Sequence, residues 1–447
     1  MIVMKFGGTS VQNEEAIGRV VSIVRGRLAE KPVVVVSALS KVTRLLVKMA
    51  EDAENGNADS VRTSLAQLRK RHYDVCDAML GGELLEQTKD KVDDFCKQLG
   101  TFVEGVCQIG ELSPRSKARI MATGELLSST IVSAAMNAAG LRCRWVDARR
   151  LIITDDNYLN ARPDLGVSAA NICRIIPRES KGADVVLTQG FISSTTEGGP
   201  SVLGFEGSDY SAAIIGMALD ADRVEIWTDV DGIRTSDPRV VSPTAKIGRV
   251  SYEEAAQMAY LGARVLHPMT IGPARGRNIP IMVLNTMNPA CEGSTVAMYD
   301  GKTGGPKAVA FLRDIDYVEI SAPDNTNSVE MISDVFSILK ENKLEISLIS
   351  HSVGRLSFTL ESGQPGLASA VRTLSARYTL VHYRDKSQLS VVGRELEVCK
   401  GISDDIKACG KVYMMSQGAS MMDVSAVVDR DSLEKMVNEL HKILFNG

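Results

Sequence analysis

Residues 2–36 constrain the fold more strongly than any other part of the sequence. Ile2–Phe6 is a short, mostly apolar segment that is followed directly by two glycines, and residues 33–36 are a run of valines. Between them, over residues 13–28, apolar side chains recur three or four positions apart, which is typical of an amphipathic helix. Continuous apolar runs are typical of strands buried in a parallel sheet. The order of strand, glycine turn, helix and strand therefore predicts an α/β fold.

The same alternation continues as far as residue 285. Residues 42–140 are expected to be mostly helical, because their apolar positions recur at helical period. Short apolar runs elsewhere predict further buried strands at residues 142–146, 185–189, 224–228 and 281–285. Helices are predicted at residues 208–219 and 252–260. Together these elements predict a largely parallel central sheet.

The glycine-rich segment Asp300–Pro306 reads as a linker to a C-terminal part with shorter elements. There, a set of strand, helix, strand and strand occurs twice, at an offset of about 65–70 residues. The first set covers residues 318–321, 329–341, 344–350 and 356–360. The second covers residues 389–392, 397–408, 412–416 and 423–428, and a last helix is expected at 432–445. We therefore predict a first domain at 1–297, a linker at 298–308 and two small α/β domains within 309–447.

Composition and charge exclude several classes of protein. The 447 residues carry a net charge of −4 and no basic block, so nucleic acid is not an expected partner. No apolar run approaches the ~18–20 residues that span a membrane. The apolar stretch before Lys5 is too short for a signal peptide, so a cytoplasmic protein is expected. The eight cysteines are scattered without metal-ligand spacing, so no disulfide or structural metal is expected.

The heptamer MKFGGTS, residues 4–10, is a candidate phosphate site. Gly7 and Gly8 let the backbone approach a ligand, so their N–H groups can point at anionic oxygens. Lys5 would add a positive charge, and Thr9 or Ser10 could cap the following helix. The lysine precedes the glycines, so this is not a Walker A loop. The alternative is a tight strand–helix turn with a solvated lysine.

Two other turns carry polar residues at strand ends. After the strand at 185–189, Ser208 and Asp209 stand where a helix cap belongs, which could mean only a well-capped helix. After the strand at 224–228, Thr228 and Asp229 occupy the carboxyl end, where open α/β sheets bind ligands.

Six motifs, in this order along the chain, resemble those of aspartate kinases in the amino acid kinase superfamily: KFGGTSV, SALSKVTRLL, ATGELLSS, LGFEGSDYSAA, WTDVDGIRTSDPRVV and GARVLHP. The C-terminal VYMMSQGASMMDVSAVVD is similar to the ACT regulatory domains that follow this kinase. The resemblance implies an amino-acid-kinase-like three-layer sandwich with a largely parallel sheet. Two ferredoxin-like ACT domains would follow it.

The resemblance also implies an activity: transfer of the γ-phosphoryl group of ATP, with Mg²⁺, to the β-carboxylate of L-aspartate. The residues that it implies for catalysis are Lys5, Gly7, Gly8 and Asp209. Those implied for the substrate are Ser37, Thr43, Arg44, Glu125, Phe205, Gly207 and Ser208, with Glu125 pairing with the ammonium group. Those implied for the nucleotide are Lys5, Gly7, Gly8, Thr9, Thr228, Asp229, Arg234, Arg239 and Arg264.

The chain departs from the family pattern at four places. Phe205-Glu206 replaces the usual Arg-Gly, so the arginine that clamps the substrate's α-carboxylate is missing. Arg44 stands where asparagine is common, and we hypothesise that it takes over this role. Arg234 replaces a nucleotide-stacking tyrosine, and Arg264 replaces a lysine.

The ACT resemblance implies an amino-acid effector, lysine or threonine. Asp324, Asn325, Ser347 and Ser352 are its candidate ligands. Relatives that respond to lysine commonly carry aspartate at the position of Ser347, so the sequence does not choose between the two effectors. ACT domains also imply a homodimer or a dimer of dimers, and dimerisation without an effector stays open.

Two other functions stay open: an amino acid kinase for another acidic acceptor, and a catalytically weak, ACT-bearing regulatory subunit. A fusion with homoserine dehydrogenase is disfavoured, because no GxGxxG module follows the ACT-like part.

Overall fold

The structure is a computed structural model that describes the whole chain except residues 205, 264–265, 267, 299–303, 324–326, 397, 400, 418–420 and 446–447. It divides into two compact units. The first contains residues 1–233, 248–252 and 266–298, and the second contains residues 234–247, 253–265 and 299–447. Two segments from before residue 297 thus belong with the C-terminal part.

The first unit is built on an eight-stranded sheet with the order β3-β5-β2-β1-β8-β10-β11-β9. Neighbouring strands run parallel except for the antiparallel pair β10–β11. The strands are β1 (Ile2–Phe6), β2 (Val33–Val36), β3 (Cys143–Val146), β5 (Val185–Gln189), β8 (Arg223–Thr228), β9 (Arg249–Ser251), β10 (Ile281–Asn285) and β11 (Ser294–Ala297). The predicted strands and the largely parallel sheet are confirmed, but β3 begins at Cys143 and, as an edge strand, is only partly buried.

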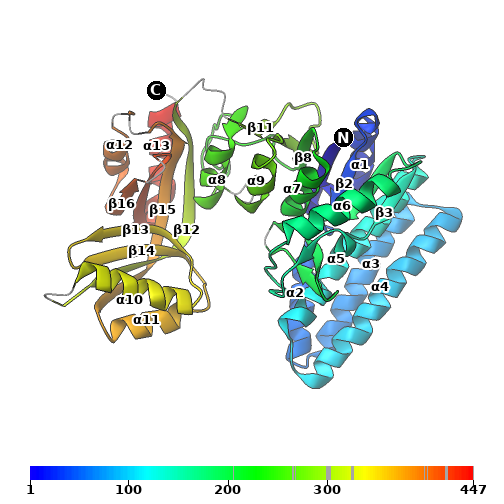
Figure 1. The fold of residues 1–447 in the computed structure, drawn as a ribbon, viewed down its shortest axis with the longest axis horizontal. Coiled ribbons are helices and arrows are strands. Elements are labelled where there is room, and N and C mark those ends of the chain that lie inside the picture. Colours follow the sequence, from blue (N-terminus) through cyan, green and yellow to red (C-terminus); the bar gives the residue numbers. More distant parts are fainter. Residues whose placement is uncertain are drawn as a thin grey trace. The chain divides into compact units, whose positions relative to one another are not determined.

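Side-chain alternation along the strands gives the sheet two buried faces. Met4 and Phe6 pack into one core with the helices α1 (Glu14–Arg25), α2 (Val42–Glu54), α3 (Ala58–Met79), α4 (Gly82–Ile109) and α5 (Pro114–Ala138). On the other face, α7 (Gly207–Leu219) approaches so closely that a Cβ on Gly216 would lie 2.6 Å from Val224 Cγ2. The result is three layers: helices, sheet and helices (Figure 1).

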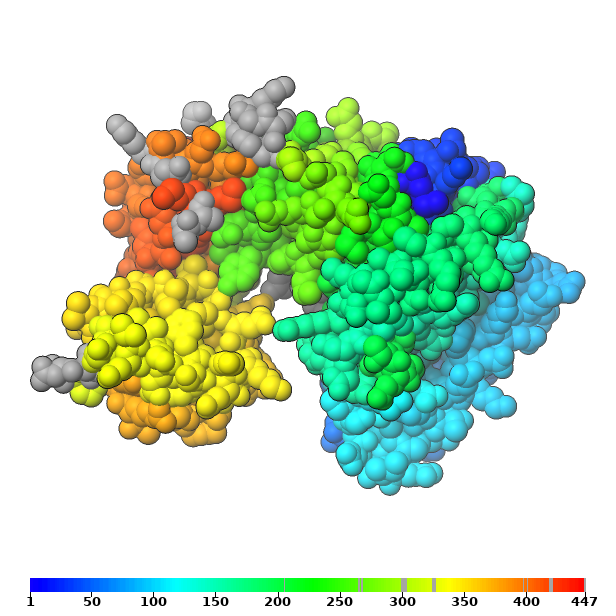
Figure 2. Space-filling view, viewed as in Figure 1, coloured from blue at the N-terminus to red at the C-terminus, as the bar shows by residue number. Residues whose placement is uncertain are grey.

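The predicted helical segment at 42–140 is confirmed as the four helices α2 to α5. The helices α3 and α4 run side by side and form part of the outer surface of the first unit (Figures 1 and 2). A small second sheet has the strand order β4-β6-β7. It consists of β4 (Ile153–Thr154), β6 (Ile192–Thr195) and β7 (Pro200–Val202). On the other side of the main sheet, α6 (Leu165–Glu179) and α9 (Pro268–Arg275) flank α7.

The second unit holds a six-stranded antiparallel sheet with the order β13-β14-β12-β15-β17-β16. Its two central strands are long and are shared by two cores: β12 (Gly305–Ser321) and β15 (Thr379–Arg394). One core lies under α10 (Ser328–Glu341) and α11 (Leu367–Ser375), the other under α12 (Ile402–Cys409) and α13 (Leu433–Phe445). The remaining strands are β13 (Ile346–Ser352), β14 (Arg355–Glu361), β16 (Val412–Gln417) and β17 (Asp423–Asp429).

Three expectations for the C-terminal part need correction. Residues 305–308, predicted as linker, begin strand β12. The short strands predicted at 318–321 and 389–392 are parts of the longer strands β12 and β15. The pairing of these two strands shifts register between Leu312 and Tyr317. Because of these shifts, the apolar pattern along each strand is interrupted, and the sequence does not show that each is one strand. The helix predicted to begin at residue 397 begins at Ile402, because Gly401 (φ 98°) adopts a left-handed conformation that ends the preceding turn.

Several elements were not predicted, chiefly α6, α9, α11 and the small sheet β4-β6-β7. α8 (Tyr252–Tyr260) is confirmed with the predicted bounds.

Among the described residues, no helix is both long and apolar enough to cross a membrane.

Candidate active site

Parallel strands in register bring several strand ends to one rim of the main sheet. Backbone bonds join these ends directly: Ser37 N–H donates to Phe6 O at 3.1 Å, and Gly190 N–H donates to Val36 O at 2.9 Å. Gly7 N–H donates to Trp227 O at 3.2 Å, and Thr286 N–H to Thr228 O at 2.8 Å. The turns after β1, β2, β5, β8 and β10 therefore lie side by side, as expected for a ligand site in an open α/β sheet.

An ion pair between Lys5 and Asp209 stands at this rim. The Lys5 Nζ lies 2.5 Å from Asp209 Oδ1, and the two side chains are only 12% and 6% exposed. Lys5 projects from β1, and Asp209 is in the first turn of α7. A nearly buried pair holds its ammonium group in one place, since an exposed lysine would sample many rotamers.

The glycine turn after β1 is shaped by close backbone packing. A Cβ on Gly8 would lie 3.0 Å from the carbonyl oxygen of Ala38, so a side chain there requires the turn to shift. A Cβ on Gly7 would lie 3.5 Å from Lys5 Nζ, so Gly7 keeps the space beside the ammonium group open.

The sequence predicted that the N–H groups of both glycines are available to a ligand. This is wrong for Gly7, because its N–H already donates to Trp227 O. The short helix η1 (Gly8–Val11) begins here, and Ser10 N–H donates to Gly7 O at 3.0 Å. Among the described residues, Gly8 N–H has no backbone acceptor, so Gly8 rather than Gly7 offers the free donor.

Glu125 is a buried carboxylate on α5 beside the turn after β2. Its Oε1 accepts a hydrogen bond from Ala38 N–H at 3.2 Å, while Oε2 has no hydrogen-bond partner among the described residues. Burial raises the pKa of Glu125 to about 8, and the bond from Ala38 only partly offsets that effect. Ser128, one turn further along α5, donates from Oγ to Ser37 O at 2.8 Å. A buried acceptor without a donor is where a ligand's cationic group could bind.

Two neighbouring residues in α2 differ in exposure. Thr43 is half-buried and Arg44 is exposed. No described carboxylate lies within ion-pair distance of Arg44, so its guanidinium group is not committed elsewhere in the chain.

The start of α7 packs tightly against the turn after β5. A Cβ on Gly190 would lie 2.5 Å from Ser208 Cβ, so only glycine allows this approach. Phe191 N–H donates to Ser211 Oγ at 3.0 Å, which ties the two segments together. Ser208 and Gly207 are buried here. Phe205 lies outside the described residues.

Sequence reasoning gave Gly190 no role and did not find the buried hydroxyl pair at the rim, Ser10 and Thr286. Their oxygen atoms are 2.7 Å apart, and Ser10 Oγ also donates to Trp227 O at 3.4 Å. The glycine of QGF at the end of a predicted strand was a usable signal for Gly190. The Ser10–Thr286 pair joins residues 276 positions apart and left no local signal.

The residues predicted for the nucleotide fall in different parts of the chain. Thr228 ends β8, and its Oγ1 donates to Oδ1 of the exposed Asp229 at 3.2 Å. Thr9 is half-buried in η1. Arg234 and Arg239 belong to the second unit, where Arg234 Nε donates to Thr244 Oγ1 at 2.6 Å and Arg239 binds Asp237 with two nitrogen atoms.

Arg264 lies outside the described residues, as do Asp324 and Asn325. Ser347 is half-buried and Ser352 is exposed, near opposite ends of the edge strand β13.

No group of three or more His, Cys, Asp or Glu residues within the described ranges could hold a metal ion.

Comparisons with known proteins agree with this geometry. Residues 1–285 match the amino acid kinase family. The chain is 31% identical over 462 aligned residues to the lysine-sensitive aspartokinase 3 of Escherichia coli K12, covering 100% of this chain and 99% of that protein. It also matches bifunctional aspartokinase/homoserine dehydrogenases, such as that of Arabidopsis thaliana at 29% identity, but spans only about half their length (50%).

Two crystal structures of E. coli aspartokinase III are similar over the whole chain. The complex with aspartate and ADP (R-state) has a TM-score of 0.91 at 28% identity, covering 100% of both chains. The complex with lysine and aspartate (T-state) has a TM-score of 0.82 at 29% identity, covering 100% of this chain and 99% of that chain.

Proposed function

The chain belongs to the amino acid kinase family, among its aspartokinases, and we propose that the rim around Lys5 is where it transfers the γ-phosphoryl group of ATP to L-aspartate. The product is 4-phospho-L-aspartate. The observation that carries the assignment of the site is the 2.5 Å ion pair between Lys5 and Asp209, at the point where the strand ends meet.

The chemistry requires charge neutralisation more than a general base. The β-carboxylate of aspartate is already ionised at neutral pH, because such a group titrates near ~3.9. The difficulty is to bring this anion up to the phosphates and to stabilise the charge on the transferring group. Lys5 supplies the positive charge, and Gly8 N–H supplies a donor beside it. Asp209 positions the ammonium group of Lys5.

We propose that Glu125 receives the substrate's ammonium group. Within the part of the chain that the structure describes, its Oε2 has no hydrogen-bond partner, and its burial disfavours the charged carboxylate unless a cation binds. A bound ammonium group would lower the pKa of Glu125 and satisfy the orphaned oxygen. Ser37 and Thr43 would line the same pocket, because both follow the end of β2.

We propose Mg²⁺ as the counter-ion of ATP. The described residues offer no cluster of acidic or other metal-binding side chains, which fits an ion held mainly by phosphates and water. When bound, the ion supplies neutralisation of phosphate charge. Thr9, Thr228 and Asp229, which all belong to the first unit, are proposed to bind the nucleotide. Arg234, Arg239 and Arg264 stay nucleotide candidates from the sequence alone.

The α-carboxylate of aspartate needs a cation, because Phe205 replaces the usual arginine. Arg44 is our candidate, since it is exposed on α2, one residue after Thr43, and has no described carboxylate partner. Arg44→Ala is expected to raise the KM for aspartate at least tenfold, in line with the loss of a charge-assisted hydrogen bond of roughly 1.5–3 kcal/mol. A KM within about twofold of wild type would contradict the proposal.

We further propose feedback regulation by an amino acid, lysine or threonine, and assembly of the chain as a homodimer or a dimer of dimers. The lysine complex of the E. coli relative supports the first part. Ser347 and Ser352 on β13 are the described candidates for the effector site. The cytoplasm is the proposed location.

One assay tests the whole assignment. ATP turnover is measured with aspartate, glutamate and acetylglutamate as acceptors, each with and without lysine and threonine. Turnover with aspartate alone is expected, with inhibition by one of the two amino acids. Turnover only with glutamate or its acetyl derivative would identify a kinase for another acidic acceptor, and no turnover would indicate a regulatory subunit.

A further inference from the structure

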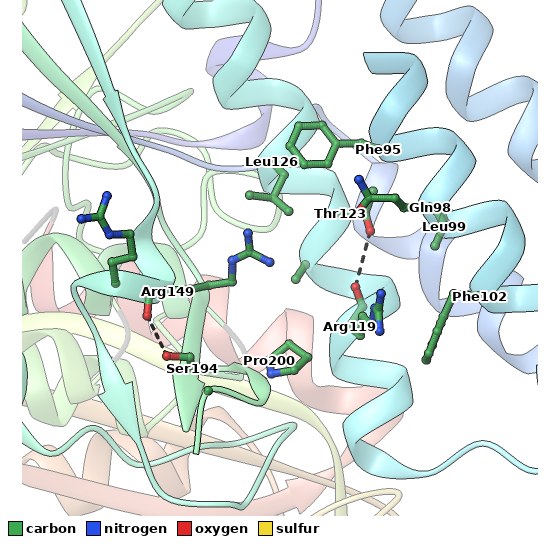
Figure 3. A pocket seen from close by; sticks show the side chains of 13 residues that line it. Phe95, Gln98, Leu99, Phe102, Arg119, Thr123, Leu126, Arg149, Ser194 and Pro200 are labelled. Atoms are coloured by element: carbon green, nitrogen blue, oxygen red, sulfur yellow. Dashed lines mark hydrogen bonds between the residues drawn. The ribbon is translucent and has the colours of Figure 1, made fainter. Parts of the chain in front are cut away.

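A cavity of the first unit lies among α4, α5, η3 (Ala148–Arg150) and the β6–β7 hairpin. Its volume is about 370 Å³, which lies within the range of sites for small ligands. None of the residues assigned above to aspartate or ATP lines it. Figure 3 shows Arg119 and Thr123 on one side of this cavity and Arg149 and Ser194 on the other.

Positive charge dominates the polar part of the lining. Arg119, Arg149 and Arg150 line the cavity, and none of its described lining residues is acidic. Arg149 is held by Asp147 through Nε and Nη2, at 2.9 and 2.6 Å. No carboxylate of the described residues pairs with Arg119 or Arg150. Two guanidinium groups are thus available to an anion, while Arg149 is fixed in place by its own partner.

The rest of the lining is apolar. Phe95 and Phe102 of α4, Leu126 of α5 and Pro200 of β7 contribute to the walls. Arg119 lies over the ring of Phe102, with its Cζ 4.5 Å from the ring centroid, so its guanidinium group is pre-oriented by an aromatic face. Thr123 and Ser194 already donate to backbone carbonyls, to Arg119 O at 3.4 Å and Arg149 O at 2.6 Å, so the arginines remain the main donors to a ligand.

From this combination, we propose that the cavity is a second small-molecule site, which binds an oxyanion group, carboxylate or phosphate, attached to a flat apolar body. The oxyanion binds between Arg119 and Arg150, where planar guanidinium groups can offer paired donors. The apolar body packs against Phe95, Phe102 and Leu126. This site is independent of the proposed kinase function, because it shares no residue with it.

Isothermal titration of the full chain with phenyl phosphate and with phenylacetate tests the proposal. Saturating ADP, Mg²⁺ and aspartate are present to occupy the kinase site. One molecule of at least one probe is expected to bind per chain, and the tighter probe identifies phosphate or carboxylate as the preferred group. Benzyl alcohol, which lacks the charge, is expected to bind at least tenfold more weakly.

Two matched variants decide where the probe binds. The double variant Arg119→Gln/Arg150→Gln is expected to weaken binding at least tenfold, while Arg174→Gln, an exposed arginine on α6, leaves it within twofold. All three replaced side chains are exposed, and a thermal melt verifies that the variants fold. The proposal fails if wild type shows no saturable binding of either probe, if the double variant binds as wild type, or if Arg174→Gln weakens binding equally.

Discussion

Lys5 has two roles that a single substitution cannot separate. It neutralises the buried carboxylate of Asp209, and we propose that it also neutralises the transferring phosphoryl group. Removing one member of a buried ion pair leaves an uncompensated charge, whereas removing both can be nearly neutral for stability. Stability and catalysis at this position can therefore be separated only by a paired design.

We expect Lys5→Met to lower kcat at least a hundredfold. Other enzymes lose about this much activity when one donor to the charge of the transition state is removed. It should also destabilise the fold by about 3–5 kcal/mol, because Asp209 is left buried and unpaired. Lys5→Met/Asp209→Asn should recover most of the stability but none of the turnover. Denaturant unfolding and steady-state kinetics measure the two effects, and recovery of turnover in the double variant would refute the role given to Lys5.

The raised pKa of Glu125 is expected to make pH act in opposite directions on the stability of the fold and on substrate binding. Its pKa is raised from the usual 4.5 to about 8 in the folded chain, so between these values the folded state binds the proton more tightly than the unfolded state. The contribution of Glu125 to the free energy of unfolding therefore falls as pH rises from 4.5 to 8, by at most ~1.4 kcal/mol per pH unit. The affinity for the substrate's ammonium group should instead rise with pH, because only the charged carboxylate attracts it.

Glu125→Gln is expected to remove both dependences. The variant should be more stable than wild type near pH 8, and its KM for aspartate should be high and nearly independent of pH. The measurements are unfolding curves and KM for aspartate from pH 6 to 9, a range in which the substrate's ammonium group stays mostly charged. A wild-type KM that does not change over this range would contradict the role of Glu125.

At the scale of elements, the turn between β1 and η1 offers a matched pair of substitutions. Gly8→Ala places a methyl group 3.0 Å from a backbone oxygen, so we expect a loss of about 1–3 kcal/mol of stability. Gly7→Ala has room, since its nearest neighbour is Lys5 Nζ at 3.5 Å, so stability should change little. Its methyl group nevertheless occupies space beside the ammonium group, and kcat should fall at least tenfold. A Gly7→Ala variant with wild-type kcat would show that phosphate does not bind there.

The sequence predicted individual elements well where their apolar pattern is continuous. The valines of β2 and the apolar positions of α10 lie in continuous patterns, and both elements were predicted within one residue. Prediction failed for β12 and β15, because each long strand faces two separate cores and carries register shifts between them. It also failed for the pair β6–β7, whose three- and four-residue strands are too short to show a period.

At the scale of the whole molecule, two segments from before residue 297 depend on the C-terminal part of the chain. Val309 N–H donates to Thr235 O at 2.8 Å, and Thr235 Oγ1 lies 2.8 Å from His441 Nε2. Val241, which is 3% exposed, belongs to the core under α12 and α13. The sequence predicted a boundary between the catalytic and regulatory parts after residue 297. Cutting the chain there would therefore divide one compact unit.

We expect a fragment of residues 1–297 to be less stable than the full chain, or to aggregate, because it exposes Val241 and leaves the partners of Thr235 missing. Thermal unfolding and size-exclusion chromatography compare the fragment with the full chain. Restoration of solubility by Val241→Ser would support this cause. A monomeric fragment that unfolds at the same temperature as the first transition of the full chain would contradict it.

The sequence by itself determined the α/β class, most strands of the main sheet and the identity of the family, because buried strands, glycine turns and family motifs are local patterns. It also singled out Lys5, Glu125 and Asp209 as site residues. Only the tertiary structure decided that Lys5 pairs with Asp209, that Gly7 N–H is already used, and that one oxygen of Glu125 has no partner among the residues described. These facts depend on contacts between residues far apart in the chain, and the packing of strand ends at one rim, not any local pattern, creates those contacts.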